Sequence, residues 1–380
     1  MKNAALRVIH RLCWRRLPRS LRRRMLFLYM RKTAPRAKGI SIGPNDPIYI
    51  AGFFSTASGL GQSARLSLTE LRQKHPEAIG IDLSHSLLQP TDLSPAADVM
   101  VPSTSLPSGP GQVIIHVNAP FAPWANKALG SAFLERKRII GYWAWELPDI
   151  PPDWHQGFDY VDEIWVPSQF TKNAIATHTT KTVRVVPHAL PSSPPSARRF
   201  AEDGVIRIIS IFNMASGFTR KNPLAAIRAF QTAFAFDERA ELIVKLSHPD
   251  AYPDGVRLIE ATVAGWPNIR IIETILSAEA IANLYRHADI YLSLHRSEGF
   301  GLPLLEAKSM GLHVVATGWS GNVDFMQGPR CHGVPYHLVP AEDPQGTYDY
   351  VNMQWAEPDI DAAALILRRI SAERFSGHRM

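Results

Sequence analysis

Two glutamates near the C-terminal end of the chain, Glu298 and Glu306, flank a glycine-rich stretch. The apolar run 288–294 before them is typical of a buried strand, and the run 303–310, which starts with proline, is typical of a helix. The glycines therefore lie where a strand passes into a helix, and unpaired amides and the helix dipole favour an anion there. Carboxylates accept hydrogen bonds from sugar hydroxyl groups. The pattern therefore suits a sugar joined to a nucleotide through a diphosphate.

Taken alone, Glu298 also fits a plain helix start that the dipole stabilises. The longer string 297–307 is more specific, because its two glutamates, separated by seven residues, resemble the E-x(7)-E signature of a known family. That family comprises the retaining glycosyltransferases of the mannosyltransferase-like and sucrose-synthase-like group (glycosyltransferase family 4, glycosyl transferases group 1), which have the GT-B fold. The resemblance continues over residues 284–289 and 314–321.

The resemblance implies a role for each part of this string. It implies that Glu298 contacts hydroxyl groups of the donor sugar and that Glu306 accepts hydrogen bonds from the ribose. It also implies that backbone groups between the two glutamates hold the sugar and the diphosphate, namely those of Gly299, Phe300, Gly301 and Leu302. A buried hydrogen bond to a charged group contributes roughly 1.5–3 kcal/mol, so loss of Glu306 should weaken donor binding about tenfold or more.

Two basic residues, Arg220 and Lys221, precede the helical run that starts at Pro223. Cations are disfavoured at a helix N-terminus, so their presence indicates an anionic ligand nearby. By the resemblance, Lys221 contacts the donor diphosphate and stabilises the leaving group. The family usually adds an Arg at the end of the preceding strand, but residues 212–214 contain none. Either Arg220 substitutes for it, or the diphosphate relies on Lys221 and on amides.

A second glycine-containing turn, with Gly59 and Gly61, follows the strand-like run 48–53. It could bring backbone amides close to a phosphate, or it could be a tight turn without a ligand. In the family, the matching loop lines the cleft near the transferred sugar and the acceptor.

Four other residues are candidates for contacts with the acceptor or the sugar. His116 and His188 lie at the ends of strand-like runs, where a histidine can equally be structural. Many family members end the strand that here reads 142–146 with a histidine, and this chain has Trp145 and Glu146 in that region instead. The Trp145 ring could pack in the core or stack on a sugar.

The order of the predicted elements favours an α/β fold. Strand and helix patterns alternate from residue 48 and again from residue 206, which predicts two parallel sheets covered by helices. By the resemblance, these are two Rossmann-like domains that face each other across a cleft, the GT-B fold.

The expected strands are 48–53, 113–117, 138–143, 163–167, 183–187, 206–211, 240–245, 269–272, 288–294 and 314–316. The expected divisions are a basic amphipathic arm at 1–46, an acceptor domain at 47–190, a linker at 191–204, a nucleotide-sugar domain at 205–360, and a C-terminal helix and tail at 361–380.

The N-terminal arm carries a strong positive charge. Thirteen Lys and Arg side chains lie in residues 1–38 and no acid precedes Asp46, whereas the whole chain has a net charge of only +7. Leu21, Met25 and Leu28 recur at helical spacing, and Trp14 adds an aromatic ring. We expect this arm to bind an anionic membrane surface and not nucleic acid, because a phosphate contact alone would not need these apolar residues. A solvated basic tail is the alternative.

Other patterns limit the chemistry. The two cysteines cannot build a disulfide framework, and no apolar run approaches the length of a membrane span. Asp359 and Asp361 resemble a metal-binding D-x-D motif, but they precede a helical run and fit helix capping. We therefore expect no metal and no cofactor. Because little chain follows Arg369, the helix with which GT-B chains commonly cross back to the first domain should be short or absent.

These features and the resemblance together predict a retaining glycosyltransferase. It would transfer a hexose, with mannose from GDP-mannose favoured over UDP-sugars, to a saccharide acceptor that we expect to be lipid-linked. Its place would be polysaccharide or lipopolysaccharide biosynthesis, on the inner face of the cytoplasmic membrane. The alternative is a catalytically silent GT-B protein that binds a saccharide or a partner.

Overall fold

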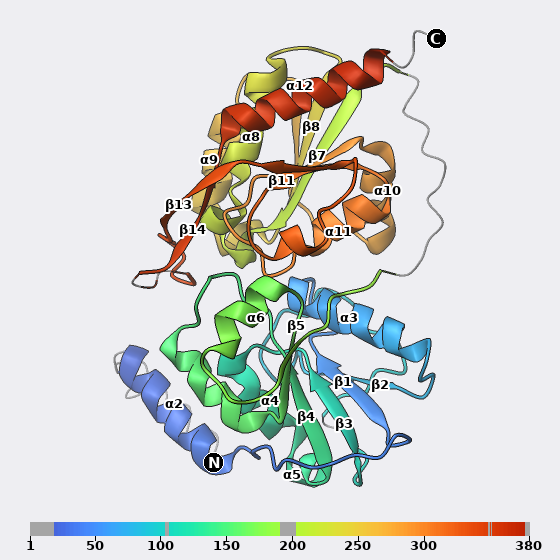
Figure 1. Ribbon diagram of the computed structural model, residues 1–380, viewed down its shortest axis with the longest axis vertical. Coiled ribbons are helices and arrows are strands. Elements are labelled where there is room, and N and C mark those ends of the chain that lie inside the picture. The colour runs from blue at the N-terminus through green and yellow to red at the C-terminus, as the bar shows by residue number, and fades with distance from the viewer. Residues whose placement is uncertain (1–18, 103–105, 191–202, 349, 351, 377–380) are drawn as a thin grey trace, which may run out of the picture.

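The computed structural model describes residues 19–102, 106–190, 203–348, 350 and 352–376. Residues 1–18 of the predicted arm, Trp14 among them, and most of the predicted linker lie outside this description. The described chain forms two parallel α/β halves arranged end to end along the long axis (Figure 1). We call the half that contains the earlier sheet the first domain and the other half the second domain, and we keep the predicted boundaries as a proposal.

The first domain is built on a six-stranded parallel sheet in the order β2-β1-β3-β4-β5-β6. Its strands are β1 (Ile48–Gly52), β2 (Ile79–Asp82), β3 (Gly111–Ile115), β4 (Lys137–Tyr142), β5 (Glu163–Val166) and β6 (Val183–Val185). Its helices are α2 (Arg19–Thr33), α3 (Gly59–Arg72), α4 (Ala122–Leu129), α5 (Ser131–Leu134) and α6 (Gln169–Ala176), with the 3₁₀ segments η2 (Ala119–Phe121) and η3 (Pro152–Tyr160).

The second domain repeats this plan with the strand order β12-β11-β10-β7-β8-β9. Its strands are β7 (Ile206–Asn213), β8 (Ala240–Ser247), β9 (Ile269–Ile272), β10 (Ile290–Ser293), β11 (His313–Thr317) and β12 (Cys331–Val334). Its α-helices are α7 (Phe218–Lys221), α8 (Pro223–Phe234), α9 (Pro253–Val263), α10 (Ala278–His287), α11 (Leu302–Ser309) and α12 (Ile360–Ser376). Its 3₁₀ segments are η4 (Met214–Ser216), η5 (Pro249–Ala251) and η6 (Gly321–Asp324).

All ten expected strands are present, and the sequence prediction missed β2 and β12. Both missed strands lie at the edge of their sheet, are four residues long and contain a glycine. A short edge strand pairs on one side only and does not need the long apolar run that identifies a central strand. The predicted two-domain α/β fold is therefore confirmed, and each of the two parallel sheets has one more strand than expected.

The domains are linked by an antiparallel hairpin that the sequence prediction also missed. It consists of β13 (Tyr336–Pro340) and β14 (Gln354–Pro358), and it reaches from the second domain toward the first (Figure 1). Tyr348 and Trp355 of the hairpin region belong to the same buried apolar cluster as Trp145 and Trp154 of the first domain. The hairpin region thus makes an apolar contact between the two domains.

The C-terminal helix α12 stays with the second domain. Its Ala363 and Leu367 are buried in one cluster with Ala226 and Phe230 of α8. Burial of these apolar side chains fixes α12 along the outer face of the second sheet, away from the first domain (Figure 1). No described helix has both the length and the apolar character needed to cross a membrane.

Candidate functional site

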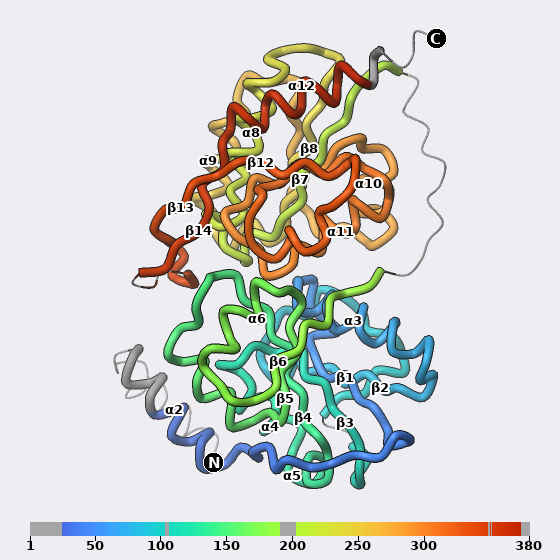
Figure 2. The backbone as a smooth tube through the Cα atoms, viewed as in Figure 1, coloured from blue at the N-terminus to red at the C-terminus, as the bar shows by residue number. Residues whose placement is uncertain are grey.

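The carboxyl ends of the strands in both sheets meet at the boundary between the domains. The backbone tube shows α11 at the end of the second domain that faces the first, next to α3 and α6 (Figure 2). The Ser168 hydroxyl donates to the carbonyl of Gly299 at 2.6 Å, and the Gln169 amide donates to Asp324 Oδ2 at 2.6 Å. Ligands of parallel α/β sheets bind at such strand ends, so this boundary is the candidate site.

A buried ion pair lies at the centre of this boundary. Lys221 Nζ contacts Glu298 Oε1, and Arg220 Nη1 lies 3.3 Å from Oε2 of the same carboxylate. Burial alone would raise the pKa of Glu298, but the charges of Lys221 and Arg220 outweigh it and lower this pKa to about 2. Burial lowers the pKa of Lys221, while the attraction of Glu298 opposes that change. The site therefore holds a fixed negative charge between two cations.

Arg220 is committed to the protein itself. Its Nε and Nη2 donate to the carbonyl of Ser216 at 3.2 and 2.8 Å, and its Nη1 donates to the carbonyl of Ser297 at 2.7 Å. The guanidinium lies 5.3 Å from the centre of the Tyr348 ring, and only 3% of the residue is exposed. In this geometry Arg220 holds the segment that leads to Glu298, and its role toward a donor diphosphate stays a prediction.

The loop after Glu298 is fixed from the side of β11. The Glu298 amide donates to Ser320 Oγ at 2.8 Å, and the Gly321 amide donates to the Glu298 carbonyl at 2.8 Å. A Cβ atom on Gly321 would lie 2.2 Å from the Gly299 carbonyl oxygen, so no side chain fits there. Ser320 itself has φ +76°, a strained value that such contacts maintain. Sequence reasoning did not identify Ser320 as part of the site.

A buried network of hydrogen bonds joins the segments that follow β10 and β11, next to the loop after Glu298. His295 Nε2 lies 3.0 Å from Asn322 Oδ1, and the side-chain Nδ2 of Asn322 donates to the Thr317 carbonyl at 3.0 Å. The Thr317 hydroxyl donates back to the His295 carbonyl at 2.5 Å. These residues follow or end β10 and β11, so polar residues at strand ends were the signal that could have found them.

Glu306 lies inside α11, where its Oε2 accepts a hydrogen bond from the Tyr285 hydroxyl at 3.0 Å. Burial raises the pKa of Glu306, and the Tyr285 hydrogen bond opposes that rise. One carboxylate oxygen of this partly buried side chain is thus positioned by the protein.

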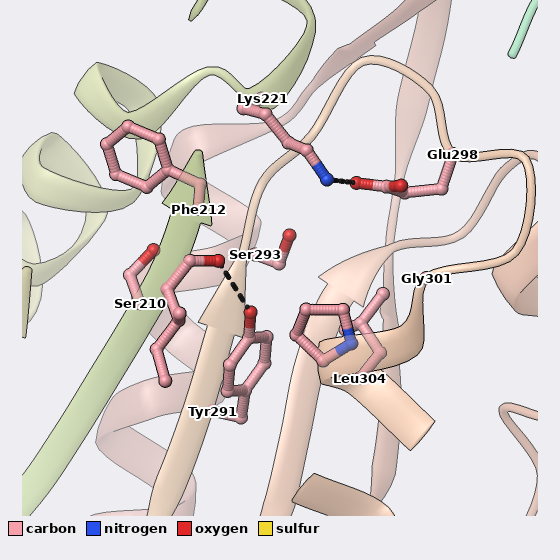
Figure 3. A pocket seen from close by; sticks show the side chains of 10 residues that line it. Ser210, Phe212, Lys221, Tyr291, Ser293, Glu298, Gly301 and Leu304 are labelled. Atoms are coloured by element: carbon pink, nitrogen blue, oxygen red, sulfur yellow. Dashed lines mark hydrogen bonds and ion pairs between the residues drawn. The ribbon is translucent and has the colours of Figure 1, made fainter. Parts of the chain in front are cut away.

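A small cavity of about 10 Å³ lies beside the ion pair (Figure 3). Figure 3 shows Lys221 and Glu298 pointing at each other along one side of it, and the Tyr291 hydroxyl donates to the Ile211 carbonyl at 3.0 Å on another. The cavity is lined by Ser210, Ile211, Phe212, Lys221, Tyr291, Ser293, Glu298, Gly301, Pro303 and Leu304. It has room for roughly one water molecule, so a larger ligand must part Lys221 from Glu298 to enter here.

The turn that contains Gly59 and Gly61 lies at the start of α3 in the first domain, beside the end of β7. A Cβ atom on Gly61 would lie 2.4 Å from the Thr56 carbonyl oxygen, whereas one on Gly59 would meet nothing within 4 Å. The Asn213 side chain donates to the carbonyl of Ala57 at 3.3 Å, which holds the turn beside the end of β7. Gly61 is therefore required by the turn itself, and Gly59 leaves open space that a ligand could use.

The rings of His116 and His188 both pack against the ring of Tyr142. His116 is fully buried, with Nδ1 2.7 Å from Ser63 Oγ and its ring stacked on Tyr142 at 4.4 Å. The centroid of the His188 ring lies 5.1 Å from that of Tyr142. It also lies 5.1 Å from that of Phe300 in the loop 298–302, with the two rings edge to face. Burial lowers both pKa values, that of His188 to about 4, so both rings are neutral at pH 7. Of the two, His188 is the one in contact with the loop 298–302.

The idea that Trp145 is a platform for a sugar is wrong for this structure. Only 5% of the residue is exposed, and its ring packs 4.9 Å from Trp154 and 5.7 Å from Tyr348. Its Nε1 donates to the Asp149 carbonyl at 2.7 Å. Core packing, the alternative that the sequence left open, accounts for this tryptophan because large aromatic surface is best buried.

Glu146 does face the centre. Its Oε2 accepts a hydrogen bond from the Tyr348 hydroxyl at 3.2 Å, and its carbonyl accepts one from the Ser297 hydroxyl. Burial raises the pKa of Glu146; the cations Arg220 and Lys221 oppose this rise. The structure thus brings together Lys221, Arg220 and Glu298 of the second domain with a carboxylate of the first.

The D-x-D pattern lies at the start of α12, where Asp359 caps the helix and Asp361 is in its first turn. Asp359 Oδ1 accepts a hydrogen bond from the Ala362 amide at 2.9 Å at the start of α12. Within the described parts of the chain, no group of three or more His, Cys, Asp or Glu side chains is arranged to hold a metal ion.

Comparisons with known proteins agree with this geometry. Residues 213–353 match the family model described as Glycosyl transferases group 1. This segment contains Lys221, Glu298 and Glu306. No curated protein shows a significant match to the sequence.

Several solved structures have a similar fold at low sequence identity. Trehalose-6-phosphate synthase OtsA has a TM-score of 0.57 at 14% identity, over 88% of this chain and 94% of that chain. The lipopolysaccharide outer core galactosyltransferase WaaB has 0.55 at 13%, over 87% and 91%. HepE from Anabaena, in complex with UDP-glucose, has 0.52 at 13%, over 87% and 99%. The chain therefore has the GT-B fold of these glycosyltransferases, and its second domain resembles the group 1 family in sequence.

Proposed function

We propose that this protein is a glycosyltransferase that moves a hexose from a nucleotide-diphosphate sugar to a saccharide. The observation that carries the proposal is the buried Lys221–Glu298 pair at the strand ends that face the first domain, within the segment that matches the family model. An ion pair of this kind can exchange partners: the donor diphosphate replaces Glu298 as the partner of Lys221. The released carboxylate then accepts hydrogen bonds from hydroxyl groups of the sugar.

In the reaction, the bond between the anomeric carbon and the diphosphate oxygen breaks, and the electron pair leaves with the diphosphate. The acceptor hydroxyl oxygen bonds to the same carbon, and its proton passes to the departing diphosphate oxygen. Lys221 and the amides at the start of α11 stabilise the charge that develops on the leaving group. Glu306 would hold the ribose through the oxygen that Tyr285 does not use. Retention of the anomeric configuration is part of the proposal by resemblance to the family.

For the donor, we propose GDP-mannose first, with UDP-hexoses as the main competitors. The titles of similar structures name UDP-glucose for HepE and a galactosyltransferase activity for WaaB, so uridine donors belong in the first panel. No metal or other cofactor is part of the proposed mechanism, because Lys221 and backbone amides supply the positive charge.

For the acceptor, we propose a lipid-linked saccharide of polysaccharide or lipopolysaccharide biosynthesis, reached from the inner face of the cytoplasmic membrane. Helix α2 supports this proposal, because it exposes large apolar side chains next to basic ones. Leu28 and Tyr29 are 53% and 54% exposed, and the last turn of the helix carries Arg31 and Lys32. Apolar contact combined with basic charge favours binding to an anionic lipid surface.

The activity is tested by incubating the purified protein with GDP-mannose, UDP-glucose and UDP-galactose and a panel of saccharide acceptors, with release of nucleoside diphosphate and sugar transfer as the readouts. We expect transfer with one donor and none in a Lys221→Ala variant.

Flotation with anionic vesicles, with RNA retention in parallel, tests whether the protein binds an anionic membrane surface. Binding to RNA alone would contradict that proposal.

One observation favours a second function, a catalytically silent protein that binds saccharide. The cavity beside Lys221 holds little more than a water molecule, and Arg220 is used within the protein. Saccharide binding without turnover of any donor in the panel would select this function over the first.

A further inference from the structure

The loop between β13 and β14, which we call the strap, lies at the boundary between the domains. Asp343 Oδ2 accepts hydrogen bonds from the amides of Thr347 and Tyr348 at 2.9 and 3.1 Å, which orders the loop internally. Gln345 ties it to the second domain, because its side chain accepts from the Phe218 amide at 2.5 Å and donates to the Met214 carbonyl at 3.1 Å. The strap therefore presents Tyr348 in a defined position.

Tyr348 touches charged groups of both domains at once. It is only 5% exposed, its hydroxyl donates to Glu146 Oε2 at 3.2 Å, and the guanidinium of Arg220 lies over its ring. Its ring also packs against Trp145, the neighbour of Glu146 in the chain. One side chain of the strap thus orients the carboxylate of the first domain relative to the cations of the second.

Glu146 is hard to explain as a structural residue. Its side chain is partly buried, and both burial and the like charge of Glu298 raise its pKa. The other charged or titratable groups that face it are Arg220 and Lys221 on α7 and Tyr348 on the strap. A glutamine would accept the same hydrogen bond from Tyr348 without the like-charge repulsion. A partly buried carboxylate with an oxygen left for a further donor suits a ligand that carries hydroxyl groups.

We propose that Glu146 accepts a hydrogen bond from a hydroxyl group of the bound saccharide and that Tyr348 is the residue that positions it. This inference rests on the proposed function, since it needs a saccharide in the cleft. The hydroxyl group belongs either to the transferred sugar or to the acceptor, and the kinetics below separate the two.

The test compares Glu146→Gln and Tyr348→Phe with a control on the same hairpin, Tyr336→Phe, whose side chain is 41% exposed. We expect Glu146→Gln to lower kcat/KM about 10- to 100-fold while nucleoside diphosphate binding stays unchanged. Tyr348→Phe should lower kcat/KM about fivefold, and Tyr336→Phe should match the wild type. A rise in the acceptor KM assigns the hydroxyl group to the acceptor, and a rise in the donor KM assigns it to the donor sugar.

The pH profile distinguishes positioning from a merely structural role. The hydroxyl of Tyr348 lowers the pKa of Glu146, so its removal should move the acidic limb of the kcat/KM profile to higher pH. Glu146→Gln should abolish that limb. Melting temperatures of the three variants show whether each one folds.

Two results would overturn the inference. One is a Glu146→Gln variant with wild-type constants and pH profile, and the other is a Tyr348→Phe variant that loses activity without any shift of the limb. If the wild type transfers no sugar, the proposed function fails by itself. Binding of methyl mannoside and methyl glucoside to the wild type and to Glu146→Gln then decides this inference separately, and equal affinities contradict it.

Discussion

The two faces of the cleft are built from different chemistry. The second domain presents Lys221, Arg220 and Glu298, whose charges lie within a few ångströms of one another. The first domain places the neutral ring of His188 and the carboxylate of Glu146 at this boundary, with the buried His116 behind them. Fixed charges suit a diphosphate, whereas neutral rings and hydrogen-bonding groups suit a sugar. From this comparison we propose that the second domain holds the donor and that the first domain meets the saccharide.

The charged face should suffer most from a change of charge. Glu298→Gln leaves the cations Lys221 and Arg220 without their buried partner and removes the acceptor for the sugar hydroxyl groups. We expect kcat/KM to fall by about a hundredfold or more in initial-rate assays with the active donor. Glu279→Gln, at an exposed glutamate of α10 that pairs with Arg286, is the control. A loss of less than threefold would remove Glu298 from the reaction centre.

The turn of the first domain should respond through stability. Gly61→Ala forces a Cβ atom to within 2.4 Å of the Thr56 carbonyl oxygen, and overpacking of this kind costs about 3 kcal/mol. Gly59→Ala meets open space, so its free energy of unfolding should stay within about 0.5 kcal/mol of the wild type. Urea denaturation of both variants measures the difference. Equal losses at the two positions would contradict the geometry of the turn.

The neutral face should respond to pH. His188 has a pKa of about 4 when folded, below its usual 6.5, so the unfolded chain binds a proton first as pH falls. The stability that the neutral ring contributes is therefore complete above pH 6.5 and is lost between pH 6.5 and about 4. His188→Phe keeps the ring contacts, and we expect it to reduce the loss of unfolding free energy between pH 7 and 4.5 by about 2 kcal/mol. An unchanged pH dependence would mean that His188 is not buried as described.

The smallest expected effect concerns the ribose. Glu306→Gln can still accept the hydrogen bond of Tyr285, but it removes one charge near the proposed ribose position. We expect the Kd for the nucleoside diphosphate to rise about tenfold by isothermal titration calorimetry. The same Glu279→Gln variant serves as control, and an unchanged Kd for Glu306→Gln would place the ribose elsewhere.

The sequence was sufficient where local pattern decides the structure. The central strands follow from their apolar runs, and the proximity of Lys221 and Glu298 follows from their places at the ends of parallel strands. The helix cap at Asp359 was also predicted, and its carboxylate accepts a hydrogen bond from the amide three positions later.

The remaining features depend on contacts between distant parts of the chain. Tyr348 reaches Glu146 across 202 positions, so no local pattern could indicate the contact. The packing of Trp145 depends on the same strap, because Tyr348 covers one side of its ring. Arg220 resembled a ligand for phosphate in the sequence, and only the fold shows that its donors are used by backbone carbonyls of Ser216 and Ser297.

In the proposed function, Lys221 holds the donor diphosphate in the second domain. The most direct test is the binding of GDP and UDP to the wild type, to Lys221→Ala and to Lys74→Ala, which changes an exposed lysine of the first domain. We expect micromolar to millimolar affinity for one nucleotide in the wild type and in Lys74→Ala, and at least about tenfold weaker binding in Lys221→Ala. Equal affinity in all three proteins would contradict the claim.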